Sequence, residues 1–513
     1  MSALPARTPE PFAAAHAQFG ALEAFLGSQE ACRLTHSELE RELERRGREL
    51  LRQLLQAHLE VRGPGEAAGP VAGADGVVRD EPHLHSRGLE TVFGAVQVER
   101  VGYGADGVAS LHPLDVELNL PPERYSHEVR RRVAEEAAKN SFDEAVQALR
   151  SATGAQVGKR QVEEMVRRAA QDFGAFYQER YESRPAEETG AILVITADGK
   201  GVVMRREDRR EATRKQAERT THKLRHRLSR GEKRNAKRMA TVAAVYTIAP
   251  YLRTPEAVLG CLAPQHGREP PDRPRPERKR VWASLEQTPD AVLREAFREA
   301  RRRDPDGQKP WVALVDGNEP QLEILRRLFR QEGYRPLIVL DFLHVAERVW
   351  KAGRDFHPDG SPELEAWVTP RLLGVLRGRA SHVAAGMRRS ATRQGFAVEA
   401  RAGVDACADY LLKYTPYLRY DRYLQEGLPI ATGVIEGACR HLVKDRMDRT
   451  GARWSLPGAE AVLRLRALRS SGDFEAYWPF HEQQEYRRHH AAHYADGKVV
   501  PVLGRQRHLK RVK

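Results

Sequence analysis

Residues 192–201, ILVITADGKG, and residues 311–318, WVALVDGN, each place an aspartate after a run of apolar residues. The runs have the length of buried strands, and the glycines that follow them are typical of turns. Asp198 and Asp316 are therefore predicted at strand ends of one α/β sheet, where side chains from adjacent strands converge. A third acid, Glu436, lies among small residues in the segment GVIEGACRHLVKDRM at 433–447.

Three carboxylates on rigid elements suit a site that binds hard cations. Two Mg²⁺ ions about 3.5 to 4 Å apart can share such ligands and clamp both oxygens of a displacement at phosphorus. We expect Asp198, Asp316 and Glu436 to be the catalytic residues and the ligands of two Mg²⁺ ions, for which Mn²⁺ substitutes. Taken singly, each aspartate also fits a turn or helix cap, and the small neighbours of Glu436 fit helix packing equally well.

The composition indicates a cytoplasmic protein that associates with polyanions. The chain has 513 residues and a net charge of +14, with 41% hydrophobic and 30% charged residues. It contains no apolar run long enough for a membrane span, so we expect no membrane partner. Its four cysteines are widely separated and indicate neither disulfides nor a zinc ribbon. The positive charge favours nucleic acid as partner.

Much of that positive charge lies in residues 205–238, which contain fifteen lysines and arginines and five acids. The position of this segment between two predicted strands makes it a candidate for phosphate contacts. We predict that Arg225, Arg227, Lys233 and Arg234 contact DNA. The alternative is a solvated helix face.

Residues 124–139, 141–151 and 156–173 have the pattern of three helices. The last two are joined by a short connection with a turn glycine, Gly154, as in a helix-turn-helix. Lys159, Arg160 and Gln161 open the last helix and are predicted to contact DNA, because such residues reach base edges and phosphates. A helical hairpin that only packs within the protein is the alternative.

Five segments carry a resemblance to a known family: ITADGKGV, VALVDGN, VLDFLHV, GVIEGACRHLVKDRM and GARWS. They resemble the DDE transposases of bacterial insertion sequences, in particular the ISKra-type family, over Leu89 to Trp478. The resemblance implies an RNase H-like fold, an N-terminal DNA-binding region and a helical insertion before the last acid. It also implies that Asp198, Asp316 and Glu436 form the catalytic triad.

Further site residues follow from the same segments. Asp341 and His344 resemble the DxxH motif of related transposases and are predicted to support the triad, although a satisfied buried histidine is the alternative. Arg440 and Lys444 lie four residues apart after Glu436 and are predicted to grip DNA phosphates. Trp454 is a candidate for stacking on an unpaired base, or else a core residue.

The predicted fold is α/β: an RNase H-like core interrupted by an all-helical insertion, after a helical DNA-binding region with a small β-hairpin. The predicted parts are an N-terminal helical segment (1–62), a β-hairpin region (78–120) after a linker, a helix-turn-helix-like domain (121–188), the first part of the core (189–344), the insertion (345–430), the last part of the core (431–480) and a basic tail (481–513). The leucine-rich N-terminal helix is either ordinary packing surface or a dimerisation element.

These expectations define a DNA transposase that cuts and joins strands with Mg²⁺. Its partners would be double-stranded DNA, both terminal inverted repeats and target, and further copies of itself in a homodimer or higher oligomer. Its place would be the bacterial cytoplasm, on the nucleoid when bound to DNA. Two alternatives remain: a structure-selective nuclease of the same fold, and a catalytically silent, transposase-derived DNA-binding protein.

Overall fold

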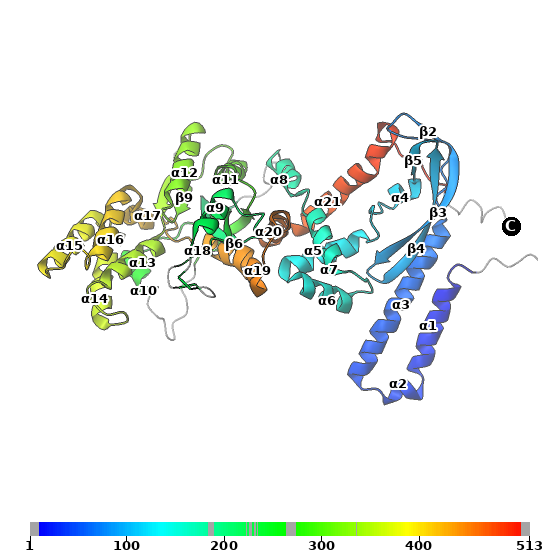
Figure 1. The fold of residues 1–513 in the computed structure, drawn as a ribbon, viewed down its shortest axis with the longest axis horizontal. Coiled ribbons are helices and arrows are strands. Elements are labelled where there is room, and N and C mark those ends of the chain that lie inside the picture. Colours follow the sequence, from blue (N-terminus) through cyan, green and yellow to red (C-terminus); the bar gives the residue numbers. More distant parts are fainter. Residues whose placement is uncertain are drawn as a thin grey trace, which may run out of the picture. The chain divides into compact units, whose positions relative to one another are not determined.

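The computed structural model describes residues 10–182, 189–221, 223–224, 228–229, 232, 234–262, 273–334 and 336–503. They form helices and strands in a mixed α/β architecture (Figure 1). The chain divides into two compact units: Met1–Phe176 with Phe474–Lys513, and Tyr177–Asp473. No helix among the described residues is long and apolar enough to cross a membrane.

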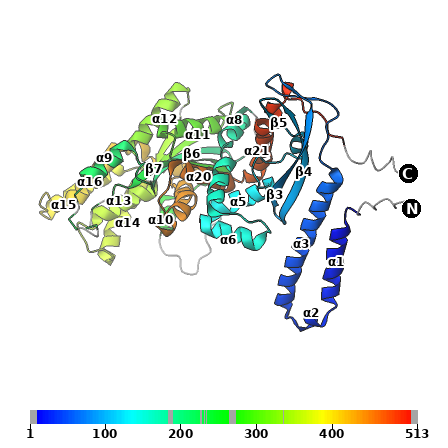
Figure 2. The same cartoon turned by 45° about the vertical axis from the view of Figure 1, so that its right-hand side comes forward.

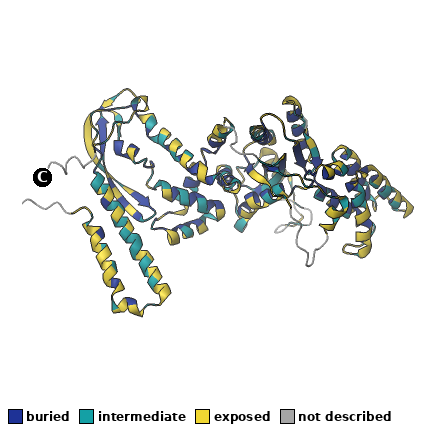
Figure 3. Cartoon of the chain, turned by 180° about the vertical axis from the view of Figure 1, so that it is seen from behind, coloured by how far each residue is buried: buried dark blue, intermediate teal, exposed yellow. Residues whose placement is uncertain are grey.

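The first unit begins with a helical hairpin, in which α1 (Ala13–Leu26) lies beside α3 (His36–Arg62) and α2 (Gln29–Arg33) joins them (Figure 2). The side chain of Glu38 accepts a hydrogen bond from the backbone N–H of Thr35, which fixes the start of α3. The leucine-rich face of α3 is only partly covered. Leu51 is 46% and Leu54 is 38% exposed, as the exposed colouring of these helices shows (Figure 3).

An antiparallel sheet follows, and it is larger than the predicted hairpin. Strands β3 (Glu81–Thr91), β4 (Gly94–Ala105) and β5 (Val108–Leu111) form it in sequence order. The predicted linker contributes to the same unit through β1 (Val71–Ala72), which pairs with β2 (Val78–Arg79). Val71 is fully buried against Tyr103 and Tyr494, so this stretch is part of a core rather than a free linker.

The three helices predicted over residues 124–173 are present. They are α5 (His127–Lys139), α6 (Phe142–Ala152) and α7 (Lys159–Ala169), preceded by the short α4 (Pro113–Glu117) and followed by α8 (Phe173–Glu182). The turn between α6 and α7 packs on the β3–β4 turn, since the N–H of Gly154 donates to the carbonyl of Val92 at 2.8 Å. A Cβ on Gly154 would meet the carbonyl oxygen of Phe93 at 2.4 Å, so only glycine fits there.

The C-terminal residues differ from the prediction. Helix α21 (Phe474–His489) and the turns η4 (Ala491–His493) and η5 (Ala495–Gly497) belong to the first unit. Arg130 and Glu485, both buried, form an ion pair at 2.7 Å that ties α21 to α5. Residues 474–480 were expected in the catalytic core and 481–503 in a tail. They fold with the N-terminal unit instead, and 504–513 lie outside the described residues.

The second unit is built on a five-stranded sheet in the order β10-β9-β6-β7-β8. Strands β6, β7 and β8 are antiparallel neighbours, whereas β9 and β10 run parallel to β6. Its strands and helices, in chain order, are β6 (Ile192–Val203), α9 (Glu211–Arg219), β7 (Lys237–Ile248), α10 (Pro255–Gly260), β8 (Glu277–Ser284), α11 (Pro289–Arg303), β9 (Trp311–Val315), α12 (Glu319–Gln331), β10 (Leu337–Leu340) and α13 (Phe342–Gly353).

Two features of this sheet correct the prediction. Asp198 was predicted at a strand end before turn glycines, but β6 continues to Val203 and Asp198 pairs with Val242 within it. The glycines fit a strand because the side chains of β7 cover them: a Cβ on Gly201 would meet Lys237 at 2.9 Å. Strand β8 was not predicted, because its first half, Glu277–Arg280, consists of charged residues.

Residues 345–430 contain helices and no strand, as expected for the insertion. After α13 they form α14 (Pro362–Leu376), α15 (Ala380–Arg393), α16 (Ala402–Lys413), η1 (Thr415–Tyr417) and α17 (Tyr420–Gln425). The chain then returns to the sheet through α18 (Gly433–Ala438), which packs on β6 and β7. The π-helix η2 (Cys439–Lys444), α19 (Asp445–Met447), η3 (Arg449–Gly451) and α20 (Leu456–Ser471) complete the unit.

Candidate functional site

Asp198 and Asp316 lie at equivalent places on neighbouring parallel strands. The register pairs Thr196 of β6 with Leu314 of β9, and each aspartate follows two residues later. Since side chains alternate along a strand, residues at the same offset in register point to the same face. Both are only half-buried, in contrast to the fully buried β9 before Asp316. The two carboxylates therefore reach solvent on one face of the sheet.

The helical insertion holds the loop that carries Asp316. Tyr414, directly after α16, donates a hydrogen bond to the carbonyl of Gly317 at 2.8 Å, and Tyr410 donates to that of Asp316 at 3.4 Å. Gly317 has φ of +90°, and a Cβ there would lie 3.2 Å from both Leu340 and the Tyr410 hydroxyl. Glycine is needed at this turn for both reasons. The carboxylate itself accepts a hydrogen bond from the N–H of Asn318 at 2.9 Å.

Asp341 is fully buried at the end of β10, and both of its oxygens are occupied. Oδ1 accepts from the backbone N–H of Leu343 at 3.2 Å and of Thr432 at 3.1 Å. Oδ2 accepts from the Thr432 hydroxyl at 2.9 Å and bonds to Nδ1 of His344. This carboxylate joins the start of α13 to the start of α18 and positions the groups around it.

His344 is half-buried on α13 and faces several acids. The hydrogen bond to Asp341 raises the pKa of His344 to about 9, against the cost of burial, and the charges of Asp341, Asp316 and Glu347 add to the effect. With Nδ1 engaged by Asp341, Nε2 is the nitrogen left to contact a ligand. His344 is thus a charged, oriented side chain beside Asp316 rather than a satisfied core histidine.

Glu436 is exposed on α18 and is tied to the same network. The Thr432 hydroxyl lies 3.2 Å from Oε1 of Glu436 as well as 2.9 Å from Asp341. A hydroxyl has one proton, so it donates to one carboxylate at a time. One turn further on, the thiol of Cys439 donates to Oδ2 of Asp198 at 3.2 Å. The helix that carries the third acid therefore also contacts the first.

Cys439 is buried, and it is a donor rather than a nucleophile. Burial raises the pKa of its thiol far above the ordinary range, and the charge of Asp198 and the hydrogen bond to it act in the same direction. The proton therefore stays on sulfur and points at the carboxylate. This fits the expected reduced, structural cysteine and gives it a particular partner.

Among the described residues, the three predicted ligands lack basic ion-pair partners, although the chain is strongly basic. Within the part of the chain that the structure describes, none of Asp198, Asp316 and Glu436 forms an ion pair with lysine or arginine. Asp341, His344 and Glu436 place one potential metal-ligating atom each within 4.8 Å of one another. Asp198 and Asp316 are not part of this group, so the three predicted ligands do not all lie within that distance of one another. Because the oxygens of Asp341 are already saturated, we assign it to positioning. The accessible Asp198, Asp316 and Glu436 carry the oxygen donors that hard cations prefer.

The residues after Glu436 are arranged differently from the prediction. Cys439–Lys444 is a π-helix, a feature often found at functional sites, in place of the expected α-helical spacing. Arg440 and Lys444 are both exposed, and Arg440 lies 4.0 Å from Asp445. Trp454 is only 5% exposed, and its indole N–H donates to the carbonyl of Met447 at 3.0 Å. Its ring is a core residue, which corrects its prediction as a stacking platform.

The predicted phosphate contacts between β6 and β7 fall mostly outside the described residues. This is so for Arg225, Arg227 and Lys233. Arg234 is described and exposed. The described α9 in the same connection has no buried residue, as expected of a solvated, charged helix.

The predicted recognition residues lie on the first unit. Lys159 and Arg160 are exposed at the start of α7, and Gln161 is half-buried. Lys159 pairs with Asp143 of α6 at 2.7 Å, and Arg160 contacts Glu164 of its own helix at 3.3 Å. Both ion pairs are at the surface and are weak enough to exchange for a phosphate or base contact. The opposite face of α7 is buried through Val162, Met165, Val166 and Ala169.

A scan against protein-family models finds no match to this chain, and a search of curated proteins finds no similar sequence.

Sequence reasoning missed the side chains that support the site. Thr432, Cys439 and Tyr414 were not singled out as functional, although Thr432 and Cys439 flank Glu436 at spacings of four and three residues, which place them on its side of a helix. That spacing was the available signal. Their partners, Asp341 and Asp198, are 91 and 241 residues away in the chain.

Proposed function

We propose that this chain is a DDE-type transposase that binds the ends of an insertion sequence and catalyses Mg²⁺-dependent cleavage and transfer of DNA strands. One observation carries the proposal. Cys439 donates to Asp198 of β6, and Thr432 joins Glu436 of α18 to Asp341. The charge of Asp316, at the end of β9, acts on His344. None of the three acids forms an ion pair with lysine or arginine among the described residues. Bound cations would offset the charge of three acids that lack such partners.

The architecture supports the same function. Strand β6 lies in the centre of its sheet. On one side β7 pairs with it antiparallel and β8 pairs antiparallel with β7, and on the other side β9 and β10 pair in parallel. A helical segment separates the second acid from the third, and this supports an RNase H-like core interrupted by an insertion. The net charge of +14 and the exposed Lys159 and Arg160 on α7 support DNA as the partner.

The chain's own residues would divide the work as follows. Asp198, Asp316 and Glu436 would hold two Mg²⁺ ions, which, when bound, lower the pKa of water and stabilise charge on a phosphate. Asp341 would keep His344 oriented, so that its Nε2 reaches a phosphate oxygen or the second acid. Arg440 and Lys444 would hold the scissile strand through its phosphates.

The proposal includes self-association on DNA. Phe19 and Leu26 of α1 are 50% and 41% exposed, and they accompany the exposed Leu51 and Leu54 of α3 on the helical hairpin. Exposed apolar side chains of this kind favour contact with another apolar surface over solvent. A second copy of the chain is the partner that a transposase would require.

The test is a cleavage assay on DNA that carries the ends flanking the gene. Asp198→Asn, Asp316→Asn and Glu436→Gln should each lower cleavage by more than about a hundredfold, because even indirect changes at metal sites cost 10- to 100-fold. DNA binding should change little, since its affinity comes from basic residues elsewhere. Glu363→Gln, an exposed acid on α14, is the matched control and should cleave normally. Wild-type cleavage by any triad variant would remove that residue from the site.

Two other functions give different results in the same assays. A structure-selective nuclease would cut DNA but form no joined product when given precut ends. A catalytically silent DNA-binding protein would bind the ends and cut nothing, with or without Mg²⁺. If the chain is a transposase, the wild-type protein must both cleave the DNA ends and join them to target DNA.

A further inference from the structure

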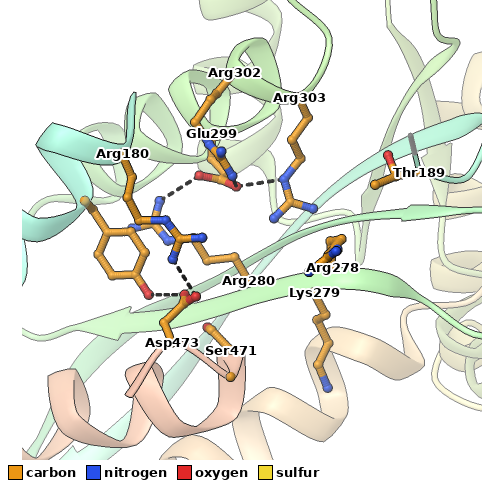
Figure 4. A pocket seen from close by; sticks show the side chains of 12 residues that line it. Arg180, Thr189, Arg278, Lys279, Arg280, Glu299, Arg302, Arg303, Ser471 and Asp473 are labelled. Carbon is orange, nitrogen blue, oxygen red and sulfur yellow. Dashed lines mark hydrogen bonds and ion pairs between the residues drawn. The ribbon is translucent and has the colours of Figure 1, made fainter. Parts of the chain in front are cut away.

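A basic site lies in the second unit, beside the edge strand β8. A cavity of about 260 Å³ is lined there by six basic side chains and two acids, Glu299 and Asp473 (Figure 4). The basic residues come from three elements: Arg180 from α8, Arg278, Lys279 and Arg280 from β8, and Arg302 and Arg303 from α11. The lining therefore carries a clear excess of positive charge.

The acids in this cavity are already engaged by its own residues. Asp473 accepts hydrogen bonds from the Tyr177 hydroxyl at 2.7 Å and from Arg180. Glu299 is buried and accepts from Arg303 at 2.7 Å and Arg302 at 3.1 Å, with Arg280 at 3.4 Å. Burial alone would raise the pKa of Glu299, but the charges of Arg303, Arg280 and Arg302 hold it at about 2. One carboxylate thus serves three guanidinium groups.

The remaining partner of this group does not restore neutrality. Arg280 is held over the ring of Tyr177, 3.5 Å from its centroid, and it also pairs with Glu295. Among the described residues, two carboxylates, Glu295 and Glu299, then face Arg280, Arg302 and Arg303 in a largely buried cluster. A buried net positive charge costs free energy unless an anion joins it.

Arg303 shows where that anion would bind. Its side chain is 6% exposed, and its Nη1 is a buried donor with no hydrogen-bond partner among the described residues. Nε is used by Glu299, and the guanidinium hangs from α11 toward β8 (Figure 4). A buried guanidinium N–H without an acceptor is expensive, and oxyanions match the planar fork of arginine.

The edge strand is shaped to bring its charges to the same cavity. Consecutive residues of a regular strand point to opposite faces, yet Arg278, Lys279 and Arg280 all line this cavity. The pairing of β8 with β7 shifts register between Val245 and Thr247, and Arg278 adopts φ of +47°. Irregularities of this kind redirect side chains and are frequent near binding sites. In this cavity the result is a concentration of cations.

We propose that this cavity binds a phosphate group, held by Arg303 and Arg280 inside and by Arg278 and Lys279 at its rim. The volume is below the range of about 300 to 1,000 Å³ usual for whole small molecules, so it suits a single oxyanion group. The phosphate belongs either to a bound DNA backbone or to a free ligand. A phosphate from the DNA backbone would rest on the proposed function, whereas binding of a phosphate group in this cavity does not depend on it.

The test measures binding of inorganic phosphate to the full chain by calorimetry and by thermal unfolding, against sodium chloride at equal ionic strength. Arg303→Gln removes the buried donor, and Arg278→Ala with Lys279→Ala removes the rim. Each should weaken phosphate binding by about tenfold or more, the value of one charge-assisted hydrogen bond. Arg389→Ala, an exposed arginine on α15, is the matched control and should bind as the wild type does.

Two results would overturn the proposal. Phosphate could stabilise the wild type no more than chloride does, or the rim variant could bind phosphate with unchanged affinity. The rim residues are exposed, so this variant decides the outcome if Arg303→Gln does not fold.

A second arm identifies the source by binding a short duplex at several salt concentrations. If the rim variant loses duplex affinity and its salt dependence falls, the phosphate is part of DNA. If duplex binding is unchanged while phosphate binding is lost, the ligand is free. Phosphate binding by a chain that never cleaves DNA would refute the proposed function alone.

Discussion

Replacing Asp341 by asparagine should destabilise the second unit in a way that depends on pH. The change keeps an oxygen for the N–H groups of Leu343 and Thr432 but presents an amide to His344. The pKa of His344, about 9 in the folded chain and 6.5 ordinarily, should then fall. The substitution should remove the part of the free energy of unfolding that comes from the interaction of the Asp341 carboxylate with protonated His344.

The size of the effect follows from that shift. At about 1.4 kcal/mol per pKa unit, it is worth roughly 3 kcal/mol for a group shielded from water. The His344 side chain is 38% exposed, so screening reduces this to about 1 to 2 kcal/mol. Because the folded pKa is raised, the contribution is complete below the unfolded pKa near 6.5 and disappears as the pH rises through about 9.

Urea unfolding of wild type and Asp341→Asn near pH 6 and near pH 10 measures the difference directly. We expect the gap in free energy of unfolding to narrow by about 1 to 2 kcal/mol between the two conditions. Asp355→Asn is the matched control, because Asp355 accepts a hydrogen bond from the N–H of Val404 in the same unit. An equal gap at both pH values, or the same narrowing in the control, would refute the stabilisation of protonated His344 by Asp341.

Three further outcomes are expected. Changing Arg160 or Gln161 to alanine should cost about 1 to 3 kcal/mol on the cognate DNA end and little on scrambled DNA, and equal losses in a competition assay would make α7 a packing or phosphate-binding helix. Burial lowers the pKa of His490 to about 4, so the first unit should lose roughly 3 kcal/mol as the pH falls from about 6.5 to about 4. His490→Gln should flatten that loss in urea unfolding, and an unchanged profile would count against it. Gly317→Ala should cost about 1 to 3 kcal/mol of stability through its positive φ and displace Asp316. Unfolding and cleavage assays that match the wild type would contradict that expectation.

The sequence pattern predicted those elements in which the buried positions are apolar and the exposed positions polar, or in which all positions are buried and apolar. The apolar runs of β9 and β10 and the amphipathic α5, α6 and α7 follow directly from side-chain periodicity. The sequence pattern gave the wrong element where contacts with neighbouring strands decide the local structure. The glycines around Asp198 resemble a turn, but β7 covers them and keeps β6 straight. Strand β8 begins with Glu277 to Arg280, whose charges are used at an edge and a cavity instead of marking a loop.

The candidate site shows the same limit in its supporting groups. Asp316 could be selected by its position after an apolar run, because a strand end in a sheet is a place where functional side chains gather. Asp198 follows such a run too, although it lies inside β6. The hydrogen-bond donors that contact these acids and their loops could not be selected from the sequence. Cys439 reaches Asp198 across 241 residues, and the partner of Tyr414 is the loop that begins at Asp316, 98 positions earlier. Contacts at such separations depend on the tertiary fold.

Those contacts give the helical insertion a structural part in the site. Two accessible acids are contacted by distant residues: Asp198 by the thiol of Cys439, and the loop of Asp316 by Tyr410 and Tyr414. Glu436 is contacted by Thr432 at the start of its own helix. Removing residues of α16 would therefore free the second acid even with all three carboxylates present. Metal ligands must be held to within about 0.5 Å to act together. Under the proposed function, the insertion would therefore contribute to the geometry of the site as well as separating the second acid from Glu436.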